Sequence, residues 1–348
     1  MPDWTRAFPK IANLASRLKR EPHLHEYLSE ADPAGYEELL NVALCPFINW
    51  RPFGSLKTKK EPGYAQAGLL SSKVREKWGQ AGNRAGKTAV GVYEDICDCL
   101  GLNPITLKLE QRFRVHGDDG AKMWIVSDTE ETSINIIQKT IVRDFLGTDQ
   151  NGVMWNLVKD SNGYSEGGGF KGNVLEWTNN SFMGFKFTTQ KRATFQGVPL
   201  HKVHHDEVQP KDIYDECKAR LTDYAGRFLG TMTPIFEEKK GIPWIFEDLY
   251  QLRHEKGIEF FRWSMLDNPF LPAEAKADYI RGLNEDEVAA RVHGLFVPMG
   301  VKLAFRAKLL NAMQGNIEMP VEGDLMVNGE GQVEFVRNFE EAETYGIE

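Results

Sequence analysis

Residues 81–88, A-G-N-R-A-G-K-T, carry the three groups that a phosphate-binding loop uses. Gly86 lets the backbone approach a phosphate, the Lys87 ammonium reaches the β and γ oxygens, and the Thr88 hydroxyl binds Mg²⁺. Backbone N–H groups and the start of the following helix complete the anion site. The strict pattern G-x-x-x-x-G-K-[ST] has glycine where this chain has Ala81. The alternative to a phosphate-binding loop is an ordinary turn between a strand and a helix.

Residues 200–207, L-H-K-V-H-H-D-E, end in two carboxylates, as a strand opposite the phosphate loop of a nucleotide hydrolase does. Asp206 is expected to hold Mg²⁺, and Glu207 to orient and deprotonate the attacking water. Phosphoryl transfer depends mostly on positioning and charge neutralisation, so few further groups are required. A surface Asp-Glu pair is common on its own, and only its combination with Lys87 favours hydrolysis.

Residues 227–234, R-F-L-G-T-M-T-P, indicate a strand that a proline ends. In motor ATPases a Ser/Thr-rich turn beside the hydrolytic pair senses the γ-phosphate. Thr231, Met232 and Thr233 are therefore predicted to couple hydrolysis to movement along nucleic acid. A plain strand ended by proline is the alternative.

The elements that must position these groups alternate between strands and helices, which implies a mostly parallel sheet with helices on both faces. The expected strands cover residues 73–78, 122–127, 200–207 and 228–232, with a hairpin of 174–177 and 182–188 around Asn179-Asn180. The expected helices cover residues 88–100, 132–146, 274–282 and 285–293. Residues 163–172 are expected to form a flexible loop.

Together the motifs resemble the ATPase domain of tailed-phage terminase large subunits, the motors that package DNA into procapsids. The likeness covers residues 60–300 and rests on Y-A-Q at 64–66, G-N-R-A-G-K-T at 82–88, F-Q-G at 195–197, V-H-H-D-E at 203–207, G-T-M-T-P at 230–234, L-D-N-P-F-L-P at 266–272 and A-R-V-H-G-L-F-V-P at 290–298. It implies an α/β P-loop NTPase fold, RecA-like and of the ASCE class, with a mostly parallel central sheet flanked by helices.

The patterning and composition of the sequence predict three parts of the chain. Residues 1–60 form an N-terminal helical appendage, with amphipathic stretches at 7–20 and 37–44, and a linker. Residues 61–300 form the P-loop ATPase domain, and residues 301–348 an acidic C-terminal extension. Asp324 is the only aspartate beyond residue 300, so we expect no ribonuclease-H-like nuclease and interpret the chain as an isolated motor domain.

Individual roles follow from the resemblance. Gln66 stands where the family reads adenine, and Arg84 is the loop arginine that contacts the γ-phosphate, although some relatives carry it one position earlier. The implied catalytic residues are Glu207, Lys87 and Arg84. The implied nucleotide-binding residues are Gln66, Gly82, Asn83, Arg84, Ala85, Gly86, Lys87, Thr88 and Ala89, and those for the metal are Thr88 and Asp206. Arg192, just before F-Q-G, is a candidate for the arginine finger supplied to a neighbouring subunit, and a solvent-facing loop charge is the alternative.

The implied function is ATP hydrolysis, with Mg²⁺, that moves double-stranded DNA into a procapsid. Expected partners are DNA, the portal protein and the small terminase subunit, in a homo-oligomeric ring on the portal and a monomer in isolation, in the host cytoplasm. A helicase-like ATPase acting on single strands and a nucleotide-binding scaffold in capsid assembly are the alternatives.

Composition limits these interpretations without deciding between them. The 348 residues carry a formal net charge of −8, and the nine acidic residues and one arginine of residues 318–348 account for the whole excess. Short basic clusters at 17–20 and 57–60 are either solvated surface or DNA contacts. The four cysteines form no C-x-x-C pair and suit a reducing compartment. We reject a zinc site at His201, His204 and His205 and expect these side chains to be structural or to face DNA.

Overall fold

The computed structural model describes residues 45–53, 66–110, 112–113, 119–148, 150, 152–160, 162–235, 244–297, 324–327 and 333–336. The chain divides into two units, residues 1–300 and 301–348, and each is described by itself. The expected helical stretches at 7–20 and 37–44 and the basic clusters at 17–20 and 57–60 lie outside the described residues.

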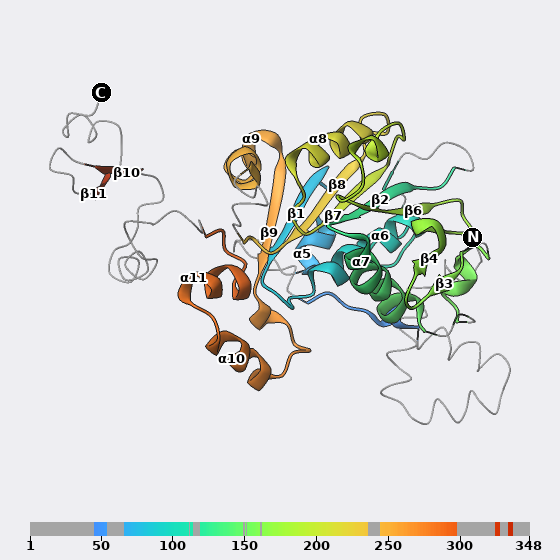
Figure 1. Ribbon diagram of the computed structural model, residues 1–348, viewed down its shortest axis with the longest axis horizontal. Helices are drawn as coiled ribbons and strands as arrows, with labels where there is room; N and C mark the ends of the chain where they lie inside the picture. Colours follow the sequence, from blue (N-terminus) through green and yellow to red (C-terminus); the bar gives the residue numbers. More distant parts are fainter. Residues whose placement is uncertain are drawn as a thin grey trace. The chain divides into compact units, whose positions relative to one another are not determined.

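The described residues of the first unit build a seven-stranded sheet in the order β5-β6-β2-β7-β8-β1-β9 (Figure 1). Its strands are β1 Glu76–Ala81, β2 Lys122–Ser127, β5 Val174–Glu176, β6 Phe182–Phe187, β7 Lys202–Asp206, β8 Arg227–Met232 and β9 Ile258–Trp263. Each described pair is parallel except β5 with β6. In this sheet β8 alone separates β1 from β7, which is the RecA-like P-loop arrangement and confirms the expected fold class.

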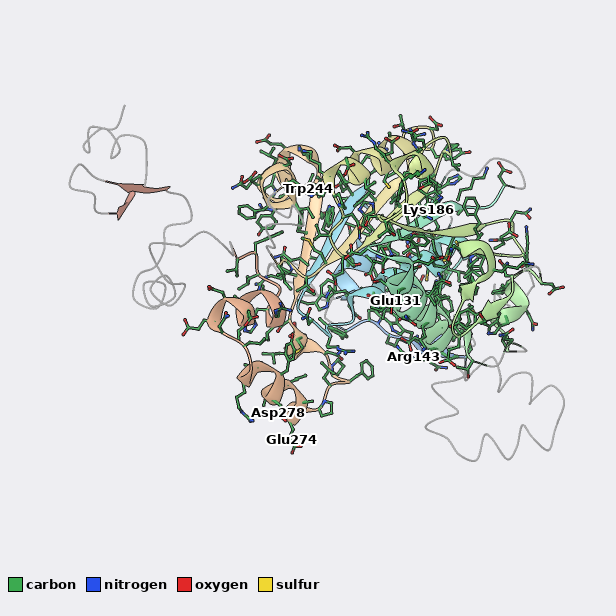
Figure 2. All side chains as sticks on the ribbon, viewed as in Figure 1. Glu131, Arg143, Lys186, Trp244, Glu274 and Asp278 are labelled. Atoms are coloured by element: carbon green, nitrogen blue, oxygen red, sulfur yellow. The ribbon has the colours of Figure 1, made fainter. Side chains whose placement is uncertain are left out.

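Helices cover both faces of the sheet, and side chains alternate between two buried cores because the strand period is two. On one face lie α5 Gln66–Ser71 and α6 Lys87–Leu100, with Ile125 of β2 in the core beneath them. On the other lie α8 Lys211–Arg220 and the π-helical segment η7 Ile245–Tyr250, with Trp124 and Val126 of β2. Trp244, which is labelled in Figure 2, lies just before η7. It packs on Tyr214 of α8 with ring centroids 4.8 Å apart.

The remaining elements border this framework. The helical ones are α4 Pro46–Asn49, α7 Glu130–Thr132 continued by η2 Ser133–Gln138 and η3 Ile141–Leu146, η4 Trp155–Leu157, η5 Lys171–Asn173, η6 Arg192–Phe195, α9 Arg253–Lys256, η8 Met265–Asp267, α10 Ala273–Arg281, and α11 Glu285–Glu287 continued by η9 Val288–Val292. Two short antiparallel pairs complete the list: β3 Tyr164–Ser165 with β4 Gly169–Phe170, and, in the second unit, β10 Asp324–Val327 with β11 Val333–Val336. None of the described helices has the length and apolar character needed to cross a bilayer.

Most predicted elements are confirmed, including β2, the β5–β6 hairpin, α6 and the helices near 274–293. The strand predicted at 73–78 is wrong by three residues, since β1 runs from Glu76 to Ala81. The flexible loop predicted at 163–172 is also wrong. It holds β3 and β4, because Phe170 is buried and its N–H donates to Gln138 Oε1 at 2.7 Å. The β10–β11 pair in the predicted acidic extension was not expected from the sequence.

Candidate functional site

The loop between β1 and α6 contains two residues with left-handed backbone, Arg84 (φ 56°) and Gly86 (φ 75°). Its carbonyl groups are held by surrounding donors. These are Asn268 Nδ2 to Arg84 O (2.7 Å), Trp263 Nε1 to Ala85 O (2.8 Å) and Gln66 Nε2 to Gly86 O (3.1 Å). The first N–H groups of α6 have no intrahelical acceptor, as at the start of any helix. Three carbonyls of the loop are therefore engaged by protein, and the free N–H groups at the start of α6 are of the kind that can bind an anion.

The glycine of this loop that permits close approach is Gly82. A Cβ added there would lie 2.3 Å from Val292 O, so only glycine fits against the backbone of η9. The Asn83 N–H donates to Arg291 O at 2.6 Å, which fixes the loop on the same segment. Ala81 is the last residue of β1 and fully buried. The chain therefore departs from the strict motif at a position that belongs to the strand, and keeps glycine where the loop touches its neighbour.

Lys87 is buried and surrounded by oxygen atoms. Its Nζ donates to Gly82 O at 3.2 Å and to Thr233 Oγ1 at 2.6 Å, and lies 3.4 Å from Glu207 Oε1. These contacts join the phosphate loop, the residue after β7 and the turn after β8. The ammonium therefore stands at the meeting point of the three sequence motifs.

Thr88 and Asp206 also meet at this point. The Thr88 hydroxyl lies 3.1 and 3.0 Å from the two carboxylate oxygens of Asp206, and the Thr231 hydroxyl donates to Asp206 Oδ1 at 2.8 Å. Burial raises the pKa of the Asp206 carboxyl, so a cation at this place would stabilise its ionised form. Mg²⁺ prefers oxygen ligands and is usually held by one or two carboxylates together with substrate phosphates. The oxygens of Thr88 and Asp206 fit that requirement.

Glu207 leaves the direction of β7 through a left-handed backbone (φ 64°). Its N–H donates to Thr231 O at 2.7 Å, and its Oε2 accepts from the Thr233 N–H at 2.9 Å. The carboxylate is 44% exposed, in contrast to its buried neighbour Asp206. Such strain is typical of functional sites and here turns one carboxylate toward solvent beside Lys87.

The three predicted coupling residues are not equivalent. Thr231 contacts Asp206, and Thr233 contacts both Lys87 and Asn83 Oδ1, the latter at 3.0 Å. Met232 is fully buried in the core on the α8 face, because neighbouring residues of a strand point to opposite faces. The structure therefore brings the two threonines into the site and leaves the methionine out of it.

The other predicted residues are distributed as follows. Gln66 is buried with its amide on the loop carbonyls of Ala85 and Gly86, and its Oε1 is buried with no hydrogen-bond partner among the described residues. Arg84 is exposed on the loop. Arg192 is 59% exposed and its guanidinium bonds Glu216 of α8 at 3.2 Å, away from Lys87 on the other face of the sheet. The adenine and trans-arginine roles stay predictions.

The structure places His201, His204 and His205 inside the protein, each at most 1% exposed. Of the two expectations for these side chains, the structural one is therefore right and the DNA-facing one is wrong.

Sequence reasoning missed a buried polar network between α6 and β7. His204 Nδ1 lies 2.6 Å from Asp95 Oδ2, and Lys202 Nζ lies 2.7 Å from Asp95 Oδ1. Burial by itself would lower the pKa of Lys202. The nearby carboxylates of Asp95, Asp98 and Glu94 have a larger, opposite effect and hold this pKa above its usual value. The signal available in the sequence was the alternation of Lys202, His204 and Asp206 on one strand face.

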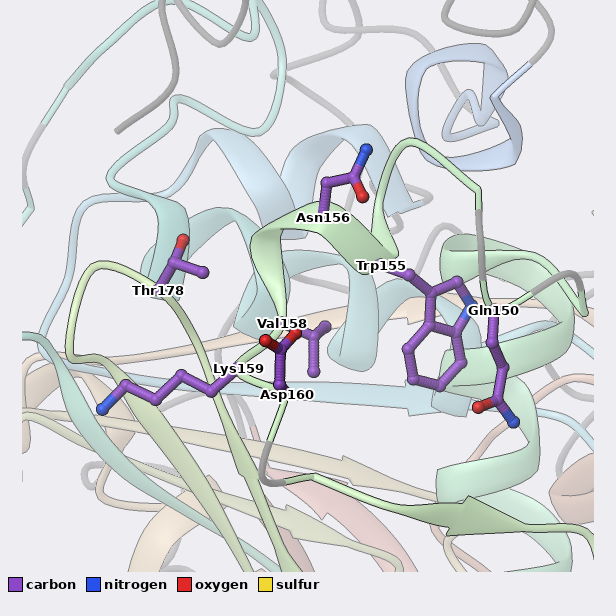
Figure 3. A pocket seen from close by; sticks show the side chains of 7 residues that line it. All are labelled: Gln150, Trp155, Asn156, Val158, Lys159, Asp160 and Thr178. Carbon is purple, nitrogen blue, oxygen red and sulfur yellow. The ribbon is translucent and has the colours of Figure 1, made fainter.

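A separate pocket of about 570 Å³ is lined by Gln150, Trp155, Asn156, Val158, Lys159, Asp160 and Thr178 (Figure 3). It contains none of the residues that the motifs predicted. Among the described residues there is also no group of three or more His, Cys, Asp or Glu side chains placed to hold a metal ion. The convergence of Lys87, Thr88, Asp206 and Glu207 is therefore the best-supported site for chemistry.

The strand β1 is followed by a glycine loop and the helix α6, and the Asp-Glu pair lies at the end of β7, which β8 alone separates from β1. This arrangement defines a P-loop NTPase fold. No model of a protein family matches the chain, and no curated protein matches it by sequence. Solved structures that are similar to it in fold include the following three. The large terminase from a thermophilic bacteriophage, in complex with ADP, has a TM-score of 0.49 and 17% identity over 67% of this chain and 52% of that one.

The other two are also from phages. The large terminase ATPase domain of Thermus phage P74-26 has a TM-score of 0.45 and 16% identity, over 71% of this chain and 100% of that one. The HK97 bacteriophage large terminase has a TM-score of 0.42 and 11% identity, over 63% of this chain and 46% of that one. The match spans about half the length of the HK97 protein and of the ADP-bound terminase.

Proposed function

We propose that this chain hydrolyses ATP and uses the free energy to move double-stranded viral DNA into a procapsid. The observation that carries the ATPase part is the convergence of Lys87 with Glu207 (3.4 Å) and of Thr88 with Asp206 (3.0 Å) at one end of the sheet. The DNA-packaging part is supported by the set of motifs that resembles terminase large subunits. No single motif is specific for this class of protein. The set of motifs, in its order and spacing along residues 60–300, is more specific than any one of them.

The chain's own residues divide the work of phosphoryl transfer. Lys87 would bind the β and γ oxygens of ATP, and Arg84 would reach the γ-phosphate from the exposed side of the loop. Thr88 and Asp206 would hold Mg²⁺, which supplies charge neutralisation on the phosphates. Glu207, exposed beside Lys87, would orient the attacking water and accept its proton.

Coupling and assembly form the finer part of the proposal. Thr231 and Thr233 contact Asp206 and Lys87, so a change at the γ-phosphate can reach the turn after β8. Arg192 would act on the site of a neighbouring subunit in a homo-oligomeric ring formed on the portal, with the isolated chain a monomer. Double-stranded DNA, the portal protein and the small terminase subunit are the proposed partners, in the host cytoplasm.

The test is Glu207→Gln, which keeps shape and removes the base. We expect the ATP hydrolysis rate to fall by roughly 10²- to 10⁴-fold, the usual contribution of a general base, with binding of MgATP retained. The matched control is Glu131→Gln, the same chemical change on the exposed face of α7 (Figure 2), which should hydrolyse ATP at the wild-type rate. Equal rates for the two variants would remove Glu207 from catalysis.

The same assay separates the proposed motor from its alternatives. Duplex DNA should raise the hydrolysis rate of the wild-type protein without separating the strands. Strand separation, followed with a fluorescently labelled duplex, would favour a helicase-like ATPase. Nucleotide binding without any hydrolysis, in the presence of DNA, would favour a scaffold.

A further inference from the structure

One face of α6 and one face of β7 meet along a row of polar side chains, all buried except the half-buried Thr88. Alternate residues of the strand face the helix, and residues three or four apart on the helix face the strand. The contacts, starting at the phosphate loop, are Thr88 with Asp206 (3.0 Å), Asp95 with His204 (2.6 Å) and Asp98 with Lys202 (2.8 Å). These three contacts therefore fix α6 to β7 at successive points along both elements.

His204 connects this row to the Asp206 carboxylate through β8. The ring is fully buried and is engaged at both nitrogens, with Nδ1 2.6 Å from Asp95 Oδ2 and Nε2 2.9 Å from Thr231 Oγ1. The same Thr231 hydroxyl is 2.8 Å from Asp206 Oδ1. Asp95 therefore orients the ring, the ring contacts the hydroxyl, and the hydroxyl contacts the carboxylate.

Gly91 shows that the helix is built around this ring. A Cβ at position 91 would lie 2.3 Å from His204 Cε1 and 2.6 Å from Nε2. Glycine inside a helix is about 1 kcal/mol less favourable than alanine, so α6 gives up helix propensity where the imidazole needs space. This observation is independent of the hydrogen bonds and points to the same residue.

We propose that His204, oriented by Asp95, is a positioning residue that holds the Asp206 carboxylate, through Thr231, in the orientation that binds Mg²⁺ with the nucleotide. The inference rests on the proposed function, because it concerns the same site. Groups that orient a metal ligand through hydrogen bonds, without touching the metal, typically lower metal affinity or activity by about 10- to 100-fold when they are removed. His204 touches neither substrate nor metal, so its effect passes through Thr231 and Asp206.

The first test is His204→Asn. The asparagine amide can replace Nδ1 as the partner of Asp95, but its shorter side chain cannot reach Thr231. We expect the Mg²⁺ concentration that half-saturates MgADP binding, followed by titration calorimetry, to rise roughly tenfold. The Mg²⁺ concentration for half-maximal ATP hydrolysis should rise by the same factor. The matched control is His205→Leu, since His205 is the neighbouring buried histidine on the opposite strand face, packed on Phe228 and Tyr214.

The second test is Gly91→Ala, alone and combined with His204→Asn. The methyl group would displace the ring without removing any polar group, so Gly91→Ala alone should raise the Mg²⁺ requirement even though alanine favours the helix. The smaller asparagine leaves room for the methyl group. In the double variant Gly91→Ala should therefore add nothing to the effect of His204→Asn.

The outcomes separate the inference from the proposed function. An unchanged Mg²⁺ requirement in His204→Asn, or effects of the two substitutions that simply add, would overturn the role of His204 alone. The same holds if His205→Leu raises the Mg²⁺ requirement as much as His204→Asn does. A wild-type protein that binds MgADP but does not hydrolyse ATP would overturn the ATPase, while calorimetry still decides on His204. A wild-type protein that does not bind MgADP would overturn both.

Discussion

Neighbouring residues at the end of β7 differ sharply in their surroundings. Asp206 is buried and accepts from two threonine hydroxyls, whereas Glu207 is 44% exposed and has a left-handed backbone. The difference follows from strand geometry, because consecutive side chains point to opposite faces and Glu207 lies just beyond the last paired residue. Under the proposed function, the buried carboxylate would hold the metal ion and the exposed one would face the water.

His205 provides a prediction at the residue scale. Burial, assisted by the neighbouring His204, lowers the pKa of His205 to about 3. In the unfolded chain an imidazole takes up a proton near pH 6.5, so between these values the unfolded state binds more protons and stability falls as the pH falls. Between about pH 7 and pH 5, the wild-type free energy of unfolding should drop by roughly 1–2 kcal/mol relative to His205→Leu.

Urea denaturation of both proteins at several pH values within that window measures the effect. The free energy of unfolding of the wild type should fall relative to that of the variant as the pH falls. Above about pH 7 the difference between the two free energies should stay constant. Parallel curves over the whole window would mean that His205 does not stay neutral in the folded protein.

At the element scale, one large side chain of β1 packs against both neighbouring strands, β8 and β9. Trp78 of β1 is fully buried and packs against Phe228 (ring centroids 5.3 Å) and Phe260 (6.1 Å). A Cβ added at Gly230 of β8 would lie 2.1 Å from the Trp78 ring. The glycine in G-T-M-T-P therefore has a packing reason that is separate from the threonines that follow it.

Gly230→Ala should for this reason destabilise the protein. Overpacking a rigid core typically lowers the free energy of unfolding by about 1–3 kcal/mol. Gly163→Ala is the matched control, because a Cβ there meets nothing within 4 Å and should change stability by less than about 0.5 kcal/mol. Denaturant unfolding compares the two, and equal stabilities would show that β8 and Trp78 can separate without loss.

The elements also show what the sequence could and could not predict. The bounds of β2 were predicted correctly because its apolar run reflects burial on both faces. β1 was misplaced because Glu76, Lys77 and Gln80 are buried polar residues with partners elsewhere in the fold, such as Lys77 with Glu94 at 2.8 Å. A polar residue satisfied by a distant partner is indistinguishable, in the sequence, from an exposed one.

The same reasoning applies to the site. The convergence of Lys87, Thr88, Asp206 and Glu207 was predictable because the motifs that contain them are recognised from residue spacing along the chain. The pairing of His204 with Asp95 was not, since it depends on how α6 sits on β7 over a separation of 109 residues. The register between a helix and a distant strand is fixed by packing and not by local sequence.

At the scale of the whole molecule, the order of the strands explains where the site lies. β1 and β7 are parallel to the intervening β8, so the loop after β1 and the acidic pair after β7 emerge at the same edge of the sheet. Ligands of open parallel sheets bind at the carboxyl ends of the strands. The acidic residues that give the chain its net charge of −8 are concentrated in residues 318–348, which belong to the second unit. Residues 301–348 hold nine acidic and four basic side chains, so the first unit carries a net charge of −3.

The most direct measurement is a crystal structure of the protein with Mg²⁺ and a non-hydrolysable ATP analogue. We expect the β- and γ-phosphates within hydrogen-bond distance of Lys87 Nζ, the metal ion beside the oxygens of Thr88 and Asp206, and the Glu207 carboxylate facing the γ-phosphate. An analogue bound elsewhere, for example in the pocket lined by Trp155 and Lys159, with the Lys87 ammonium still on Thr233, would contradict the account.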